Sequence, residues 1–158
     1  MDTVFSISLP RQAYTVSVVR DVLGTLLRRA GLCGNCADDV LLAVSEASAN
    51  AIDHGGPARD YVVEADLRGR WCELRISHTG TVPDPETVAE RFTADHLPLP
   101  GLDSESGRGI LLMRYLMDEV AFEGEPHTTV MLRKQVALCD GESPSAGGRV
   151  AEPSYVLL

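Results

Sequence analysis

The chain has 158 residues, of which 44% are hydrophobic and 23% are charged. This length and hydrophobic content predict one globular domain with a sizeable core and exclude a mainly disordered chain. The 23 acidic and 14 basic residues give a formal charge of -9, which would repel nucleic acid and argues against direct DNA or RNA binding. The sequence has no apolar run near the roughly 20 residues of a membrane span and no secretory signal, so we expect a cytoplasmic protein without membrane contact.

The N-terminal part of the chain predicts a strand followed by a helix. Residues 3–9 alternate apolar and polar side chains, which is typical of a short strand, and Pro10 ends the pattern. Over residues 11–30 apolar side chains recur at helical spacing, and Gly31 supplies the stop. We therefore expect one strand and one helix before the first cysteine.

Two of the four cysteines form a C-x-x-C pattern, Cys33-Gly34-Asn35-Cys36. Such a pair can be redox-active or can supply half of a zinc site. No second C-x-x-C and no H-x-x-x-H completes a metal site, and the pair does not follow a strand as in thioredoxin-like folds. We therefore favour two ordinary thiols in a turn between helices, with a redox disulfide as the alternative.

A second helix is expected from about residue 37 to residue 54. Asn35, followed three residues later by Asp38, makes a typical helix start. Gly55-Gly56-Pro57 makes a strong stop. The helix therefore spans most of the region between the cysteines and the next strand.

Two strands and a long connection follow. Residues 60–67 and 71–78 read as strands, separated by the hairpin-like turn Arg68-Gly69-Arg70. Residues 83–106 contain four Pro and many polar side chains, with a short helix expected around 86–92. Connections of this length are commonly lids over binding sites.

The C-terminal part predicts a glycine-opened helix from residue 107 and a closing hairpin with strands near 119–125 and 128–134. After residue 136 the composition is tail-like, so we divide the chain into a domain, 1–136, and a C-terminal tail, 137–158. This order of elements indicates an α+β sandwich, in which helices cover one face of a mixed, mostly antiparallel sheet.

Three polar residues of the second helix, Glu46, Asn50 and His54, are four apart and therefore form one stripe along it. Ala43 and Ala47 flank the stripe and would let another group approach closely. Asn50 can offer its carbonyl oxygen to Mg²⁺, and Glu46 can accept a proton or orient water. Taken alone, such a stripe is more often a solvated helix face.

A second candidate site is the G-x-G of Gly107 and Gly109, where a loop becomes a helix. Glycines at such a point let backbone N–H groups approach an anion, and the helix N-terminus favours phosphate. Arg108 adds a charge-assisted contact. Taken alone, the pattern is equally typical of a tight turn.

Taken together and in order, the motifs resemble the GHKL ATPase superfamily and, within it, the short anti-sigma-factor serine kinases of the RsbW type. The motifs are E-x-x-x-N-A-x-x-H-G, x-x-G-x-x-P, S-G-R-G-I-x-L-M-x-x-L-M-D-E-V and T-T-V-x-L-R-K, within residues 2–134. The resemblance implies a Bergerat fold, with ATP held between the helices and the sheet under a mobile lid.

The resemblance also implies roles for individual residues. Glu46 takes the position of the general base and Asn50 that of the Mg²⁺ ligand. In such a kinase Glu46 would take the proton from a partner's Ser hydroxyl while Mg²⁺ and backbone N–H groups neutralise the γ-phosphate. The other positions assigned to the nucleotide site are His54, His78, Gly80, Gly107, Arg108, Gly109 and Thr129, the last near the adenine.

His78 departs from the family pattern, which has an aspartate here that accepts a hydrogen bond from the adenine amino group. By the period-two rule His78 shares a strand face with Cys72, Leu74 and Ile76, so it should point towards the expected base pocket. A neutral imidazole offers one acceptor nitrogen and no charge, and losing a buried polar complement costs on the order of 10²-fold in affinity. ATP binding is therefore expected to be weakened or absent. In addition, His127 replaces the glycine before the paired threonines.

Two functions stay open at this point. The first is an anti-sigma regulator that sequesters a sigma factor, forms a homodimer, and phosphorylates an anti-anti-sigma protein of the STAS type on Ser with Mg-ATP. The second is a non-catalytic anti-sigma or protein-binding module whose nucleotide site is degenerate. The acidic surface suits the basic patches of a sigma factor, although a solubilising role explains it equally well.

Overall fold

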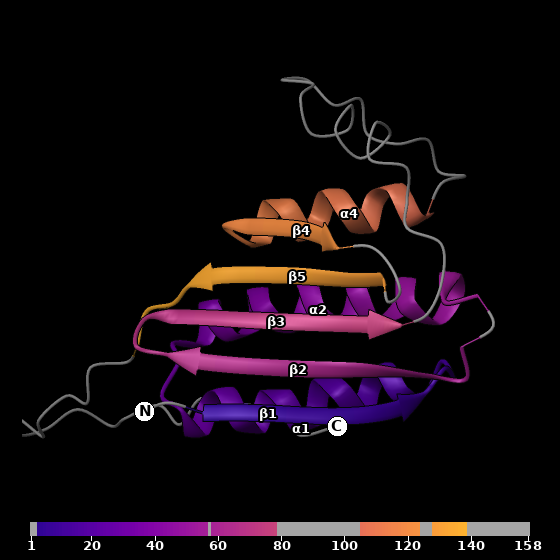
Figure 1. Ribbon diagram of the computed structural model, residues 1–158. Helices are drawn as coiled ribbons and strands as arrows, with labels where there is room; N and C mark the ends of the chain where they lie inside the picture. The colour runs from indigo at the N-terminus through magenta and orange to yellow at the C-terminus, as the bar shows by residue number, and fades with distance from the viewer. Residues whose placement is uncertain (1–2, 57, 79–104, 124–127, 139–158) are drawn as a thin grey trace, which may run out of the picture.

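The helices and strands follow one another in the order expected from the sequence (Figure 1). The computed structural model describes residues 3–56, 58–78, 105–123 and 128–138. The expected helix at 86–92 lies outside these ranges. The elements are β1 Thr3–Pro10, α1 Thr15–Arg29, α2 Gly34–His54, β2 Asp60–Arg68, β3 Trp71–His78, α4 Glu105–Leu116, β4 Glu119–Glu123 and β5 Thr128–Gln135.

The strands form one sheet in the order β1-β2-β3-β5-β4, and each described pairing is antiparallel. The turn between β2 and β3 is tight, and Gly69 within it has a φ of 57°, a backbone conformation that favours glycine. β1 pairs with β2 across the two helices that separate them in sequence, and β3 pairs with β5 across α4 and β4. The predicted α+β sandwich is therefore confirmed, with an antiparallel sheet in its described part.

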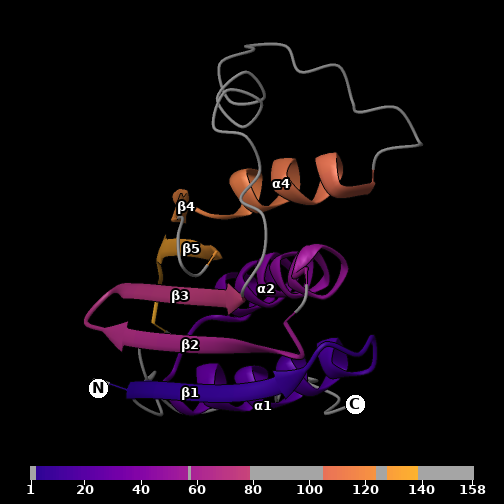
Figure 2. The ribbon, with the colours of Figure 1, turned by 45° about the vertical axis from the view of Figure 1, so that its right-hand side comes forward.

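The sheet has one apolar and one polar face, because successive side chains of a strand point to opposite sides. On β3, Cys72, Leu74, Ile76 and His78 are buried, as predicted, and Arg75 between them is exposed. The described helices lie on the buried side of the sheet (Figures 1 and 2). The largest fully buried side chains are Tyr61, Leu23, Leu27, Leu74, Ile76, Met113, Leu132, Val19, Val40, Val44, Val63 and Thr15.

α2 is the central helix of this layer. It packs on β3 and β5 and lies between α1 and α4 (Figure 2). Ala43 and Ala47, the small residues expected beside the polar stripe, have no exposed surface, and such short side chains let neighbouring helices approach closely. In the described ranges no helix is both long and apolar enough to span a membrane.

α2 begins earlier than the sequence indicated. Its first residue is Gly34 and its N-cap is Cys33, so the predicted start at Asn35 and Asp38 was wrong. The Cys33 N–H donates to the Ala137 carbonyl oxygen at 2.9 Å, and Cys33 has the extended backbone typical of an N-cap. The helix start is therefore held by a contact with a distant part of the chain.

The segment after β5 packs on the turn between α1 and α2. Leu138 forms an isolated β-bridge to this turn, and the Ala137 N–H donates to Cys36 Sγ at 3.4 Å. These contacts extend two residues beyond the expected domain end at residue 136. The rest of the expected tail, 139–158, lies outside the described residues.

The two thiols of the C-x-x-C pattern, Cys33 and Cys36, are free. Burial raises the pKa of the Cys36 thiol, and a hydrogen bond with Cys33 raises it further. A raised pKa leaves less thiolate at neutral pH and makes the thiol a poorer nucleophile, which supports the interpretation as ordinary thiols. Within the described ranges, no group of His, Cys, Asp or Glu side chains is arranged to hold a metal ion.

Stability is expected to fall at high pH because of the buried Cys72 thiol. Burial raises the pKa of this thiol from 9.0 to about 12, and the nearby Asp66 carboxylate adds to the rise. The folded chain keeps a proton that the unfolded chain loses, so this stability is fully present below the unfolded pKa and is lost as the pH rises through the folded pKa.

At pH 10.5 the expected loss is about 2 kcal/mol. Denaturant unfolding of the wild type and of Cys72→Ala, from about pH 8 to about pH 10.5, measures it. The wild type should lose about 2 kcal/mol more than the variant over this range. Parallel pH curves for the two proteins would contradict the expectation.

Candidate functional site

The polar stripe predicted on α2 is present in its C-terminal half. Glu46 and Asn50 are half-buried, and His54 is exposed as the last residue of the helix. Because successive members are four residues apart, they lie about one turn apart on the same side of the helix. The stripe thus presents a carboxylate and a carboxamide in a partly enclosed position.

The first part of α4 packs across this stripe, with Gly109 at the contact. Gly109 is buried, and a Cβ on it would lie 2.8 Å from Glu46 Oε2 and 3.8 Å from Asn50 Nδ2. A residue without a side chain is therefore needed for the Glu46 carboxylate to keep this position. The structure brings together three predicted site residues, Glu46, Asn50 and Gly109, from two helices that are far apart in sequence.

α4 begins two residues earlier than expected, at Glu105, so Gly107 lies within the first turn of the helix and not before it. The first N–H groups of a helix have no partner within it, and with the helix dipole they favour an anion such as phosphate. The Arg108 side chain is exposed near the same helix end. Groups suited to phosphate and oxygen atoms suited to a cation therefore meet where α4 crosses α2.

His78 ends β3 on the inner face of the sheet. Its side chain is 7% exposed, and it stands opposite Thr128 in the register of β3 with β5. Thr129 lies on the other face of the sheet from His78. Its hydroxyl lies 3.0 Å from the hydroxyl of Ser77, and the side chains of Ser77 and His78 point to opposite faces because they are neighbours in one strand. The expected position of Thr129 near the adenine does not match this arrangement. Gly80 lies outside the described residues.

A buried cluster of hydroxyl groups occupies the same end of the sheet as His78. Tyr61 of β2 places its hydroxyl 2.8 Å from Thr15 Oγ1, and the Ser48 hydroxyl of α2 is buried near it. Burial raises the pKa of Tyr61, and the neighbouring hydroxyl groups of Thr15 and Ser48 act in the opposite direction. No local sequence pattern indicates this cluster, because its members come from three separate elements.

Two basic residues that sequence reasoning missed hold the ends of the helices that form the site. The Arg11 side chain donates to carbonyl groups at the end of α2. Lys134 Nζ donates to the Leu116 carbonyl oxygen at the end of α4, at 2.6 Å, and lies 3.2 Å from Asp39 Oδ2 of α2. Cations at helix C-termini satisfy free carbonyl groups and suit the helix dipole. No local sequence pattern indicates a role for either residue, because the partners of both are distant in sequence.

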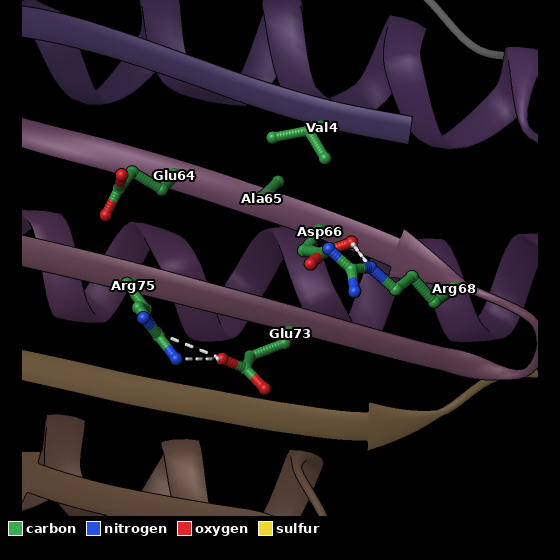
Figure 3. Close-up of a pocket in the computed structure, with 7 residues that line it drawn as sticks. All are labelled: Val4, Glu64, Ala65, Asp66, Arg68, Glu73 and Arg75. Carbon is green, nitrogen blue, oxygen red and sulfur yellow. Dashed lines mark hydrogen bonds and ion pairs between the residues drawn. The ribbon is translucent and has the colours of Figure 1, made fainter. Parts of the chain in front are cut away.

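A hollow of about 460 Å³ lies over β1, β2 and β3 and shares no residue with the α2–α4 crossing (Figure 3). Its arginines are paired with neighbouring carboxylates: Arg68 Nε lies 3.0 Å from Asp66 Oδ1, and Arg75 Nη2 lies 2.7 Å from Glu73 Oε1. Because these charges largely satisfy one another, the hollow has little capacity to select a charged ligand. Its lining residues are Val4, Glu64, Ala65, Asp66, Arg68, Glu73 and Arg75.

An antiparallel sheet with helices on one face, and a carboxylate and a carboxamide where α4 crosses α2, are typical of an ATPase domain of the histidine-kinase type. The chain belongs to the histidine kinase-like ATPase domain family, whose family model matches residues 9–134. This match confirms the GHKL membership predicted from the motifs.

Similar proteins include serine-protein kinases named RsbW. The chain is 29% identical over 138 residues to RsbW of Listeria innocua, covering 83% of this chain and 86% of that protein. It is 29% identical over 134 residues to RsbW of Staphylococcus aureus, covering 81% of this chain and 84% of that protein. These similarities agree with the resemblance found in the motifs.

A solved structure is similar in fold. The crystal structure of the RsbU and RsbW domains of Rv1364c from Mycobacterium tuberculosis matches with a TM-score of 0.62 and 21% sequence identity. The match covers 85% of this chain and 32% of that one, so this chain spans about a third of its length. The match therefore supports the fold.

Replacing Gly109 with Ala is expected to impair the site much more than the fold. The added Cβ would meet the end of the flexible Glu46 side chain and not the main chain, so the carboxylate can move aside at little cost in stability. The displaced carboxylate would no longer be in place for proton transfer, so any phosphoryl transfer that depends on Glu46 should fall by about 10²-fold. The free energy of unfolding should change by less than about 1 kcal/mol.

Transfer assays and denaturant unfolding on Gly109→Ala test this expectation. Gly24→Ala is the matched control, because a Cβ there would meet Leu41 Cδ1 at an ordinary 3.4 Å on the opposite side of α2. The control should transfer phosphate like the wild type. A Gly109→Ala protein with normal transfer would show that the position of the Glu46 carboxylate is not critical.

Proposed function

We propose that this protein is a cytoplasmic anti-sigma regulator that binds a sigma factor and, with Mg-ATP, phosphorylates a serine of an anti-anti-sigma protein of the STAS type. The proposal depends mainly on the meeting of Glu46, Asn50 and Gly109 where α4 crosses α2. The similarity to serine-protein kinases over most of both chains supports the same class of activity.

The residues at the α2–α4 crossing fit the phosphate end of Mg-ATP. A carboxamide oxygen such as that of Asn50 suits a hard cation, and the α4 start offers free N–H groups to phosphate oxygens. Because Gly109 has no Cβ, the Glu46 carboxylate and the Asn50 carboxamide can lie close to the backbone of the first part of α4. In this proposal Asn50 holds Mg²⁺, and the backbone at Gly107 and Gly109 lines the phosphates. Mg-ATP, when bound, supplies the transferable phosphoryl group.

Glu46 is proposed to act on the partner's serine. Its carboxylate would hold the serine hydroxyl and take its proton as the serine oxygen forms a bond to the γ-phosphorus of ATP, while the bond from that phosphorus to the leaving ADP oxygen breaks. Its half-buried position beside Gly109 places the carboxylate where α4 crosses α2, and proton transfer depends on such placement.

The base end of the site fits ATP less well than the phosphate end. His78 stands, almost fully buried, where the family has an aspartate. A neutral imidazole can accept one hydrogen bond, without the charge of a carboxylate. We infer that ATP binds mainly through its phosphates and Mg²⁺, with a lower affinity than an aspartate at this position would give.

The proposed partners follow from the same family resemblance. The formal charge of -9 is complementary to basic patches on a sigma factor. A homodimer is proposed as the active form. The binding of partners is tested by the experiment below.

Reconstitution with purified partners tests the proposal. The protein is mixed with the sigma factors and STAS proteins encoded in the same genome, and complex formation and transfer of labelled phosphate from ATP are measured. Sigma-factor binding, together with phosphate on a serine of one STAS protein, is the expected result. Binding to none of these proteins would refute the proposal.

A second candidate function is favoured by His78 specifically. If the imidazole prevents adenine binding, the protein would be a non-catalytic anti-sigma module that keeps the partner surface and has lost nucleotide control. Calorimetric titration with Mg-ATP separates the two candidates. Sigma-factor binding without any detectable nucleotide binding would favour the second.

A further inference from the structure

The Arg11 side chain closes the C-terminal end of α2. It lies in the connection between β1 and α1, because α1 begins at Thr15 and not at residue 11 as expected. Its guanidinium donates hydrogen bonds to the carbonyl oxygens of Ala51 (2.9 Å), Ile52, Gly56 (2.7 Å) and Ala58 (2.8 Å). We call this arrangement the Arg11 clamp.

The clamp depends on the shape of a guanidinium. Arginine presents five N–H donors in one plane, whereas the three donors of a lysine ammonium lie around a single atom. The last carbonyl groups of a helix have no partner within it, and a cation suits this end of the dipole. Gly55 leaves the space, because a Cβ there would lie 2.5 Å from Arg11 Nε and 2.5 Å from the Ala51 carbonyl oxygen.

The clamp acts on the turn of α2 that follows Asn50. Ala51 and Ile52 are the next two residues, and the clamp binds both of their carbonyl groups. Gly109 of α4 packs near the Asn50 side chain on the same turn. The position of Asn50 is therefore set by the packing of α4 and by the clamp, and helix ends that lose such partners tend to fray.

We propose that Arg11 is a positioning residue of the nucleotide site: the clamp keeps the last turn of α2 helical, so that Asn50 stays beside Gly109. The inference rests on the proposed Mg-ATP site for its ligand measurement. Because Arg11 acts through Asn50, its loss should affect Mg²⁺-dependent affinity. Proton transfer at Glu46, one turn earlier, should change less.

The test uses the full chain with Arg11→Lys, which keeps the charge and loses the planar fork. Arg20→Lys, on the exposed surface of α1, is the matched control. ATP binding is titrated with Mg²⁺ and with a chelator. We expect the affinity for Mg-ATP to fall about tenfold in Arg11→Lys, the affinity for metal-free ATP to fall less than about threefold, and the control to match the wild type.

A double-mutant cycle with Asn50→Ala shows whether the two residues act together. In the Asn50→Ala background, Arg11→Lys should change the affinity for Mg-ATP by less than about threefold. A purely stabilising arginine would instead lower the melting temperature and leave the affinity of the folded protein unchanged. Unchanged affinity, or an equal loss with and without Mg²⁺ in both backgrounds, would overturn the inference.

Hydrogen exchange without nucleotide tests the clamp independently of ATP. In Arg11→Lys the amides of residues 50–54 should exchange about tenfold faster than in the wild type or more, with residues 40–46 unchanged. If the wild type binds no Mg-ATP, the proposed function fails, and this measurement still shows whether the clamp keeps the last turn of α2 helical. Unchanged exchange at residues 50–54 would overturn it.

Discussion

Replacing Glu46 with Gln is expected to reduce phosphoryl transfer to the partner serine by about 10²- to 10⁴-fold. Gln keeps the size of the side chain, but its amide does not take up the proton of a hydroxyl. Because Glu46 packs beside Gly109, a substitution of equal size leaves the contact between α4 and α2 in place. The loss should therefore appear in kcat, with the affinity for Mg-ATP changed by less than about threefold.

Initial rates of transfer and calorimetric titration on the same preparation measure these two quantities. Glu64→Gln is the matched control, because Glu64 is an exposed residue of β2 away from the helices and the substitution changes the net charge equally. The control should behave like the wild type. Full activity in Glu46→Gln would assign the base to another group, and an equal loss in Glu64→Gln would point to a general effect of charge.

The sequence predicted the strands better than the helix ends, for a physical reason. The alternation along β3 is local, so the inward direction of His78 could be predicted and is confirmed by its burial. The start of α2 depends on the hydrogen bond from Cys33 N–H to the Ala137 carbonyl oxygen, which joins distant parts of the chain. Local start signals such as Asn35 contain no information about such a partner.

The same distinction applies to the candidate site. Spacing along one helix placed Glu46 and Asn50 in a single stripe. That Gly109 meets this stripe is a matter of tertiary packing, which the order of the motifs suggested only through family resemblance. Arg11 could not be found, because the four carbonyl groups that it binds have no side-chain signature in the sequence.

The two ends of the candidate site therefore differ in how well their residues match the family motifs. At the α2–α4 crossing, the residues match both the family motif and the chemistry of Mg²⁺ and phosphate. At the end of β3, His78 occupies the position that selects adenine in the family, and Thr129 faces away from it. In the proposed function, nucleotide control would consequently depend on what His78 does to the binding of the base.

Replacing His78 with Asp is expected to tighten Mg-ATP binding by about 10²-fold. A carboxylate at this buried position would accept a hydrogen bond from the adenine amino group with a full charge, which the neutral imidazole lacks. His78→Asn, which is nearly the same size as Asp and neutral, separates charge from shape and should give an intermediate affinity. Titration of the three proteins with Mg-ATP and Mg-GTP measures the effect, and the gain should be confined to ATP.

The same Asp substitution should destabilise the ligand-free protein, because position 78 is only 7% exposed and burying a charged carboxylate is costly. The adenine amino group of Mg-ATP would donate to this carboxylate, so the rise in melting temperature on adding nucleotide should be larger in His78→Asp than in the wild type. The substitution should thus lower the stability of the ligand-free protein and increase the stabilisation by nucleotide. A general loosening of the fold would not produce both effects. If the Asp variant binds ATP no more tightly than the wild type, residue 78 does not contribute to recognition of the adenine base. If none of the three proteins binds Mg-ATP detectably, regulation without nucleotide becomes the better account of this protein.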